Sequence, residues 1–400
     1  MCIIGQDRRK QGMNYDFDKP VNRRGTLSVK WDVAGNELPM WVADMDFETA
    51  PEIRDAIQKR AGHGAFGYTL IPDEWYESIQ NWWETRHQFR IEKDWLIFCT
   101  GVVPAISSAV RKLTTPAEKV VLLTPVYNIF FNSVVNNGRY VVECSLSYDG
   151  ECYDVDFEAL EEVLSDPQTT MLIFCNPHNP VGKIWTRETM ERIGELCWKY
   201  HVVVISDEIH CELTDPGKSY IPFASVSEKC RNNSITCIAP TKTFNLAGLQ
   251  TAAVMVPDET LRHKIWRALN TDEAAEPNVF AMTGAVAAYQ KGGPWLDALR
   301  DYLYENKQTA GEFIKKEIPK IHLVPSEATY LLWIDCREIT EDSEKLAAFL
   351  RKETGLYLSS GIQYGKTGEG FLRMNIACPR AVLKDGLQRL KDGITLYIYT

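Results

Sequence analysis

Short apolar runs alternate with stretches of helical periodicity along the chain from about residue 50 to residue 290. Apolar runs that are rich in β-branched residues and lack polar alternation indicate strands buried on both faces of a parallel sheet. Such strands are predicted at 95–99, 119–123, 171–175, 202–206 and 235–239. Helices are predicted at 51–62, 75–90, 102–113 and 186–200. This alternation predicts an open α/β sheet with helices on both faces.

The pattern changes after about residue 290. A long polar helix at 295–316 is followed by a strand at 330–334, a helix at 345–354 and a strand at 370–375, which together predict a smaller α+β domain. We therefore predict a large domain over 51–290, a small domain over 291–400, and an N-terminal segment over 13–50 that packs on the small domain. Residues 1–12 are polar and basic, precede Met13, and are interpreted as a possible leader outside the fold.

Composition narrows the classes of function. Hydrophobic residues make up 45% of the chain and charged residues 24%, which is typical of a globular protein. The net charge of −10 and the lack of a dense Lys/Arg run argue against nucleic acid or an anionic membrane as the main partner. No apolar run approaches the roughly 18 residues that span a bilayer. Eleven scattered cysteines without a C-x-x-C pair favour reduced thiols in a cytoplasmic protein.

Polar groups follow four of the predicted strands, where open α/β sheets bind their ligands. Gly101, Val102 and Val103 form a turn from strand into helix, whose free N–H groups and dipole suit a phosphate, although many structural turns have this sequence. Asn179 lies in a turn that two Asn-Pro steps make rigid, where it could bind a phenolic oxygen.

The other two strand ends carry charged residues. Asp207 follows a buried strand, where a protonated ring nitrogen would keep the carboxylate ionised; a helix N-cap is the equal alternative. Lys242 follows the next strand between two threonines, and desolvation there would lower its pKa as imine chemistry requires.

Taken in order, three motifs resemble the signature of the aspartate aminotransferase superfamily, the fold-type I pyridoxal-phosphate-dependent enzymes. These motifs are N-P-H-N-P-V-G at 176–182, S-D-E-I-H at 206–210 and T-K-T-F-N-L-A-G at 241–248. Two further stretches, at 39–47 and 370–380, resemble the branch of MalY/PatB-type cystathionine β-lyases and cysteine C–S lyases. The resemblance covers nearly the whole chain from Met13 and implies the fold-type I transferase fold.

The resemblance also implies roles for individual residues. Lys242 matches the lysine that binds pyridoxal 5'-phosphate as a Schiff base and moves the Cα proton, and Arg373 matches the arginine that grips the substrate carboxylate. Asp207 matches the partner of the pyridine nitrogen, and Asn179 the partner of the ring hydroxyl oxygen. Tyr127 matches the aromatic residue that stacks on the ring, although a core tyrosine at a strand end is the alternative. The resemblance also implies that the phosphate is bound by Gly101, Val102, Val103 and Thr241, and that Tyr68 reaches the phosphate of the neighbouring subunit.

Three positions depart from the common pattern of the superfamily. Ala239 stands where many relatives have serine, and Gln250 stands where many have a basic residue, so the phosphate would depend more on the helix dipole and hydroxyls. His210, beside the ring, occupies a position that is usually tyrosine in aminotransferases. Histidine there is shared with the C–S lyase branch and favours elimination.

We therefore expect a β-lyase that cleaves an amino acid with sulfur at the γ position, such as cystathionine or cysteine, to a thiol, pyruvate and ammonia. An aminotransferase is the leading alternative, because Lys242, Asp207 and Arg373 serve both reactions. A regulatory protein that acts through protein contacts is a second alternative.

A homodimer with shared sites is expected. G-x-G-x-x-G at 62–67 follows a helix pattern, which argues against a nicotinamide site. No metal site is assigned.

Overall fold

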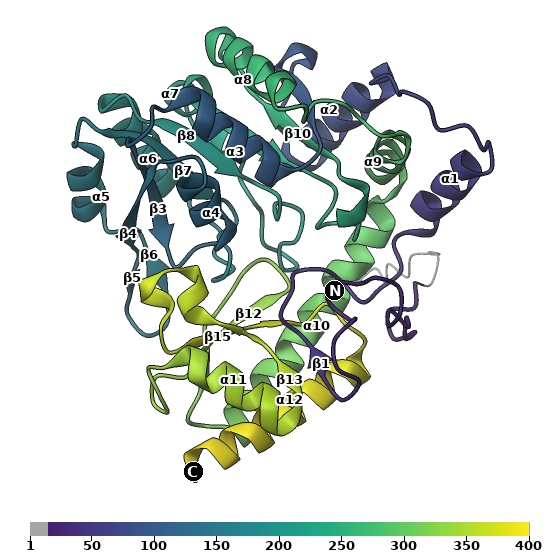
Figure 1. The fold of residues 1–400 in the computed structure, drawn as a ribbon, viewed down its shortest axis with the longest axis vertical. Helices are drawn as coiled ribbons and strands as arrows, with labels where there is room; N and C mark the ends of the chain where they lie inside the picture. The colour runs from purple at the N-terminus through teal and green to yellow at the C-terminus, as the bar shows by residue number, and fades with distance from the viewer. Residues whose placement is uncertain (1–14, 400) are drawn as a thin grey trace, which may run out of the picture.

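The structure, a computed structural model, describes residues 15–399, so the leader predicted at 1–12 lies outside the described residues. A seven-stranded sheet, in the order β2-β10-β9-β8-β7-β3-β4, forms its larger half (Figure 1). The strands are β2 (Leu96–Cys99), β3 (Lys119–Thr124), β4 (Tyr140–Ser145), β7 (Thr169–Cys175), β8 (Val203–Asp207), β9 (Ser234–Ile238) and β10 (Ala252–Met255). The five strands from β9 to β4 are parallel, and β10 is antiparallel to both of its neighbours.

Two hydrophobic clusters cover the two faces of this sheet. Apolar side chains of α3 (Val102–Leu113), α4 (Ile129–Val135) and α8 (Glu259–Thr271) pack on one face. Those of α5 (Phe157–Leu164), α6 (Arg187–Lys199) and α7 (Glu228–Asn232) pack on the other. Because both faces are covered, every residue of β9 is buried, and apolar or small side chains occupy all of its positions. The predicted open α/β sheet is confirmed.

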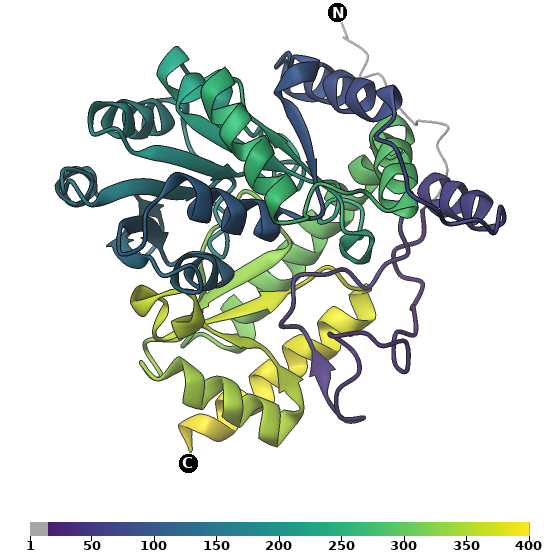
Figure 2. The same cartoon turned by 45° about the horizontal axis from the view of Figure 1, so that its top comes forward.

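A third cluster joins the remaining helices to a second sheet. It includes α1 (Pro51–Ala61), α2 (Asp73–His87) and α9 (Val279–Lys291), which pack together at the β2 end of the large sheet (Figure 2). The long helix α10 (Gly293–Glu317) runs from there to the second sheet, as Figure 1 shows.

The second sheet is antiparallel, in the order β11-β12-β15-β14. Its strands are β11 (His322–Leu323), β12 (Leu331–Asp335), β14 (Ser359–Ser360) and β15 (Phe371–Asn375), and α11 (Ser343–Thr354) and α12 (Arg380–Ile398) pack against each other beside it. The N-terminal strand β1 (Leu38–Pro39) pairs in parallel with β13 (Leu356–Tyr357). A hairpin of β5 (Ser147–Tyr148) and β6 (Tyr153–Asp154) completes the strands. Short 3-10 helices span Lys93–Trp95, Phe223–Ser225, Ala247–Leu249, Gly361–Tyr364 and Lys366–Gly368.

The predicted elements agree with the observed ones except at their ends. The helix predicted to reach residue 90 ends at His87, because Gln88 adopts a left-handed conformation with φ of 52° that closes the helix. The sequence analysis did not predict the helices α4, α5, α7, α8, α9 and α12 or the strands β4 and β10, nor the two-residue strands β1, β5, β6, β11, β13 and β14. The division of the chain at 50/51 and 290/291 stays a prediction. Within residues 15–399, no helix combines the length and apolarity needed to cross a membrane.

Candidate active site

The polar residues predicted at four strand ends follow β2, β7, β8 and β9 in the structure. Three of these strands, β7, β8 and β9, run parallel and are direct neighbours, so their carboxyl ends open at one edge of the sheet. Asp207, the last residue of β8, is flanked in register by Cys175 of β7 and Cys237 of β9. Asp207 therefore lies at the centre of this edge, and Lys242 follows the end of β9 in the next turn.

The side chain of Lys242 reaches the opposite wall of the site. Its Nζ donates a hydrogen bond of 2.6 Å to the backbone oxygen of Ala43. Burial and the nearby positive charge of Arg373 lower the pKa of Lys242 to about 8, although Asp44 and Asp207 oppose the shift. A substantial fraction of the amine is therefore neutral near physiological pH, as a nucleophilic or basic lysine requires.

Asp207 is a buried carboxylate with little compensation. Its side chain accepts a hydrogen bond of 3.1 Å from the backbone N–H of Ile209, and no ion pair to it exists within residues 15–399. Burial, with the neighbouring Glu208, raises the pKa of Asp207 to about 7, against the opposing influence of Lys242. Since a buried charge needs a partner, the site calls for a cationic group beside Asp207.

Arg373 joins β15 of the second sheet to the edge of the first. Its Nη1 donates to Oδ1 of Asn179 at 3.3 Å, and its Nη2 donates to the backbone oxygen of Trp41 at 2.8 Å. Its Nε is buried and makes no hydrogen bond with the described residues. The guanidinium thus holds the loop of Asn179 in place and keeps one unused donor within the site.

The loop that carries Asn179 also requires a glycine. Gly182 has φ of +75°, and a Cβ there would lie 2.6 Å from the backbone oxygen of Ala328. The oxygen of Gly182 accepts hydrogen bonds from the N–H groups of Glu327 and Ala328. The loop is therefore docked on the segment that precedes β12, which explains the glycine at the end of its motif.

Tyr127 and His210 belong to the same electrostatic environment. Burial raises the pKa of the Tyr127 hydroxyl to about 12, against the opposing influence of Arg373. Burial, together with the positive charges of Lys242 and Arg373, lowers the pKa of His210 to about 3. His210 is therefore a neutral imidazole, and its buried Nδ1 has no partner among the described residues.

Three of the residues predicted to bind phosphate, Gly101, Val102 and Val103, form the start of α3. Gly101 is the N-cap of α3, and no side chain caps the helix. The N–H groups of Val102 and Val103 are therefore left for a ligand, and the helix dipole favours an anion there. Thr241 is buried beside Lys242. Gln250, which stands where many relatives have a basic residue, is exposed and has φ of 54°. It offers no positive charge to a phosphate.

Tyr68 is the one predicted site residue that the structure leaves outside this group. It lies in the irregular connection between α1 and α2, and its relative exposure is 109%. Within one chain it therefore contributes nothing to the site.

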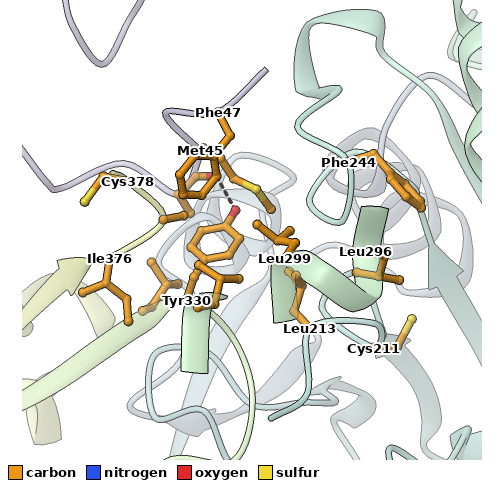
Figure 3. Close-up of a cluster of buried hydrophobic side chains, with 14 of the residues drawn as sticks. Met45, Phe47, Cys211, Leu213, Phe244, Leu296, Leu299, Tyr330, Ile376 and Cys378 are labelled. Carbon is orange, nitrogen blue, oxygen red and sulfur yellow. Dashed lines mark hydrogen bonds between the residues drawn. The ribbon is translucent and has the colours of Figure 1, made fainter. Parts of the chain in front are cut away.

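Residues 41–47, which we call the strap, form the wall that the sequence analysis did not assign. Asn375 donates from Nδ2 to the oxygens of Val42 and Asp44 at 2.6 and 2.7 Å. The hydroxyl of Tyr330 donates to the oxygen of Ala43 at 3.1 Å, a bond that Figure 3 marks above the tyrosine ring.

Asn245 fixes the end of the strap. Its Oδ1 accepts from the N–H of Met45, and its Nδ2 donates to the oxygens of Met45 and Phe47. Asn245 and Asn375 lie inside the motifs at 241–248 and 370–380, which were recognised by other residues. Their place in these motifs was the only feature of the sequence that could have identified them as site residues.

Glu208 is a second residue that the sequence analysis left without a role. Its carboxylate accepts hydrogen bonds from Ser206 at 2.8 Å and the N–H of Phe223 at 2.9 Å, and it lies very close to the hydroxyl of Tyr220. Burial raises the pKa of Glu208 to about 7, against these hydrogen bonds. Glu208 therefore links β8 to the 220–223 segment behind the site.

These groups suit one kind of ligand. An aromatic phosphate cofactor fits the carboxylate that needs a cation, the helix N-terminus that favours an anion, and the lysine with a lowered pKa. A carboxylate substrate fits the buried arginine. The neutral His210 adds no charge to this set.

Comparison with known proteins agrees with this geometry. Residues 38–390 match the family model described as aminotransferase class I and II. The chain is 42% identical to cystathionine beta-lyase PatB of Bacillus subtilis strain 168 over 95% of this chain and 100% of that protein.

Two solved structures superpose on nearly the whole chain, each with a TM-score of 0.93. The PLP-bound putative aminotransferase of Clostridium difficile 630 is 38% identical, with 95% of this chain and 100% of that chain covered. Cystalysin of Treponema denticola, which contains pyridoxal 5'-phosphate, is 32% identical, with 96% and 99% covered. These likenesses confirm the fold-type I transferase fold expected from the motifs. The chain belongs to the aminotransferase class I and II family.

Proposed function

We propose that this protein is a pyridoxal-phosphate-dependent carbon–sulfur β-lyase that acts on cystathionine or a cysteine-like amino acid. The observation that carries the proposal is the convergence of Lys242, Asp207 and Arg373 at one edge of the sheet, in a chain 42% identical to a cystathionine β-lyase over 95% of its length. The products would be a thiol, pyruvate and ammonia.

The site fits the cofactor on three independent features. The carboxylate of Asp207 feels the charge of Lys242 but forms no salt bridge with any of residues 15–399, and a protonated pyridine nitrogen would supply a direct partner. The uncapped first turn of α3 suits the phosphate, to which the hydroxyl of Thr241 would add a donor. Lys242, whose pKa is lowered to about 8, suits the aldehyde. When bound, pyridoxal phosphate withdraws the electron pair that is released as the Cα–H bond of the substrate breaks.

Asn179 and Tyr127 would complete the cofactor site. The Oδ1 of Asn179 already accepts from Arg373, so its amide nitrogen is the group left for the ring hydroxyl oxygen. The ring of Tyr127 would stack on the cofactor, and its hydroxyl stays protonated because the pKa is raised to about 12. His210, neutral near the ring oxygen, would neither add nor remove charge there.

Substrate binding would use Arg373. Its Nε is an unused buried donor, and its Nη2 is held by a backbone oxygen that a carboxylate could replace. A bidentate carboxylate on this fork would fix the rotation of the substrate about its Cα. Lys242, freed by the substrate amine, would take the Cα proton, and departure of the thiolate from Cβ would complete the elimination.

The test is to incubate the purified holoenzyme with L-cystathionine alone. Pyruvate and homocysteine should form in equal amounts without any added keto acid. Turnover that occurs only when a keto acid is supplied would contradict the lyase assignment.

An aminotransferase is the alternative that a specific observation favours. Lys242, Asp207 and Arg373 would serve transamination equally well, and the Clostridium difficile structure at 38% identity is described as a putative aminotransferase. A panel of sulfur and non-sulfur amino acids, scored separately for pyruvate release and for amino transfer, distinguishes the two activities.

The proposal includes a homodimer in which Tyr68 reaches the phosphate of the partner site. Its full exposure supports this role, as do neighbouring exposed apolar residues at Phe66 and Leu70. Gel filtration of an active monomer would contradict it. The cytoplasm is the proposed location, since all ten described cysteines are free thiols.

A further inference from the structure

Next to His210 in the sequence, but not part of the site described above, are two of three side chains whose metal-binding atoms lie close together. His87 is the last residue of α2, and Cys211 and Glu212 directly follow His210 in the loop after β8. One nitrogen, one sulfur and one oxygen atom of these residues all lie within 4.8 Å of one another. We propose that they form a site for a zinc-class divalent ion, with imidazole, thiolate and carboxylate ligands.

The geometry needs only small adjustments to hold such an ion. The Nε2 of His87 lies 2.6 Å from Oε1 of Glu212, and the sulfur of Cys211 lies 3.9 Å from the same oxygen. Zinc binds nitrogen and oxygen at about 2.0–2.2 Å and sulfur at about 2.3 Å, which places neighbouring ligands of a tetrahedral site between these two separations. The ion would take the place of the direct hydrogen bond between His87 and Glu212.

The carboxylate of Glu212 is prepared for this role. Trp82 donates to Oε1 at 2.6 Å, and Arg86 lies 3.2 Å from Oε2. Outer hydrogen bonds of this kind orient the carboxylate ligands of metal ions.

Three positive charges, on Arg86, Lys218 and Arg300, line the cavity next to these ligands, and Lys218 pairs with Glu327 at 2.7 Å. Arg86 also pairs with Asp297 at 2.8 Å, and Arg300 lies 3.9 Å from that same carboxylate. Cys211 is a buried free cysteine, and it would bind the ion as a thiolate after losing its thiol proton. The ion would displace that proton, and the resulting thiolate would offset part of the added charge.

The site also has room for a fourth ligand. A cavity of about 350 Å³ is lined by His87, Cys211, Glu212 and Ser219, among others, and could supply water to the open coordination position. The combination of thiolate and imidazole selects zinc or cadmium over magnesium and calcium, which prefer oxygen ligands. The sequence analysis assigned no such site because His87 and Glu212 lie 125 residues apart.

The experiment uses the holoenzyme without substrate. After equilibrium dialysis against Zn²⁺, bound metal is measured by mass spectrometry, and Cd²⁺ is used to observe the ultraviolet charge-transfer band of a thiolate ligand. One ion per subunit is expected. Cys211→Ser should abolish the band, and both this variant and His87→Gln should weaken binding at least tenfold.

His87→Gln keeps a donor to Glu212, so it tests ligation while the contact that joins α2 to the loop is preserved. Cys230→Ser, which changes a buried thiol elsewhere, is the matched control and should bind the ion as the unmodified protein does. Binding that is absent at one equivalent, or that His87→Gln and Cys211→Ser leave unchanged, would overturn the proposal.

Discussion

Replacement of Asp207 by asparagine tests the electrostatic argument on which the site depends. Burial, with the adjacent Glu208, raises the pKa of Asp207 from 3.8 to about 7 in the protein without cofactor. A folded-state pKa that is raised by about 3 pH units corresponds to roughly 4 kcal/mol of pH-dependent stability. Because the shift is upward, this stability is fully present below about pH 4 and is lost as the pH rises through about 7.

Asparagine resembles the protonated carboxyl group and does not titrate. We therefore expect the cofactor-free Asp207→Asn protein to gain stability relative to the cofactor-free unmodified protein as the pH rises from 4 to 8, by up to about 4 kcal/mol. The assay is urea unfolding of both proteins across this range. Glu208 is present in both, so its own titration cancels from the difference except for its interaction with Asp207. Parallel stability curves for the two proteins would refute the reasoning.

When the cofactor is bound, the same substitution should be harmful instead of stabilising. A charged hydrogen bond contributes about 1.5–3 kcal/mol, so loss of the carboxylate opposite the ring nitrogen should lower kcat/KM by at least roughly tenfold to a hundredfold. Titration of the cofactor into both proteins, followed by its absorbance, would measure the loss of affinity. An Asp207→Asn enzyme with unchanged affinity and turnover would show that Asp207 does not face the ring.

Three further substitutions test other parts of the site. Lys242→Ala should abolish both turnover and the borohydride-reducible adduct with the cofactor, and an adduct that persists on another lysine would overturn the assignment. Arg373→Lys removes the planar fork that now contacts Asn179 and Trp41, so KM for the amino acid should rise roughly tenfold to a hundredfold, whereas an unchanged KM would place the carboxylate elsewhere. Asn245→Ala breaks three hydrogen bonds to the strap and should reduce the free energy of unfolding by about 2–3 kcal/mol in urea titrations; a change below about 0.5 kcal/mol would show that the strap does not depend on it.

The strands that the sequence revealed are those whose environment is uniform. β7, β8 and β9 are apolar along most of their length because helices cover both faces of the sheet. β10 was not predicted because it has only four residues and is rich in alanine. Its antiparallel direction could not be predicted either, since the order of apolar residues does not depend on strand direction. α9 carries apolar residues all around its axis, since it is packed by α1 and α2, so it lacks the periodicity of an exposed helix.

The site divides in the same way. The sequence placed three site residues together because each lies at the carboxyl end of a predicted strand or in the turn after it: Lys242, Asp207 and Asn179. Parallel strands bring their carboxyl ends to one edge of the sheet. The contacts of the strap could not be placed, since they join residues such as Asn375 and Val42 that are 333 positions apart. No local pattern specifies which backbone oxygens those side chains will meet. Resemblance to known enzymes located the motif at 39–47, but not the hydrogen bonds that hold it.

Those long separations have a consequence for the order in which the protein assembles. The strap has no strand partner, and most of its carbonyl groups accept hydrogen bonds from side chains, while the N–H of Asp46 donates to the backbone oxygen of Ala377. Several of these partners, such as Lys242 and Asn375, lie in or directly after strands of the two sheets and come within reach only when those sheets have formed. We therefore expect the strap to be among the last segments to gain protection from hydrogen exchange during refolding. Since Lys242 is one of its partners, the reactive amine would acquire its final surroundings in that same late step.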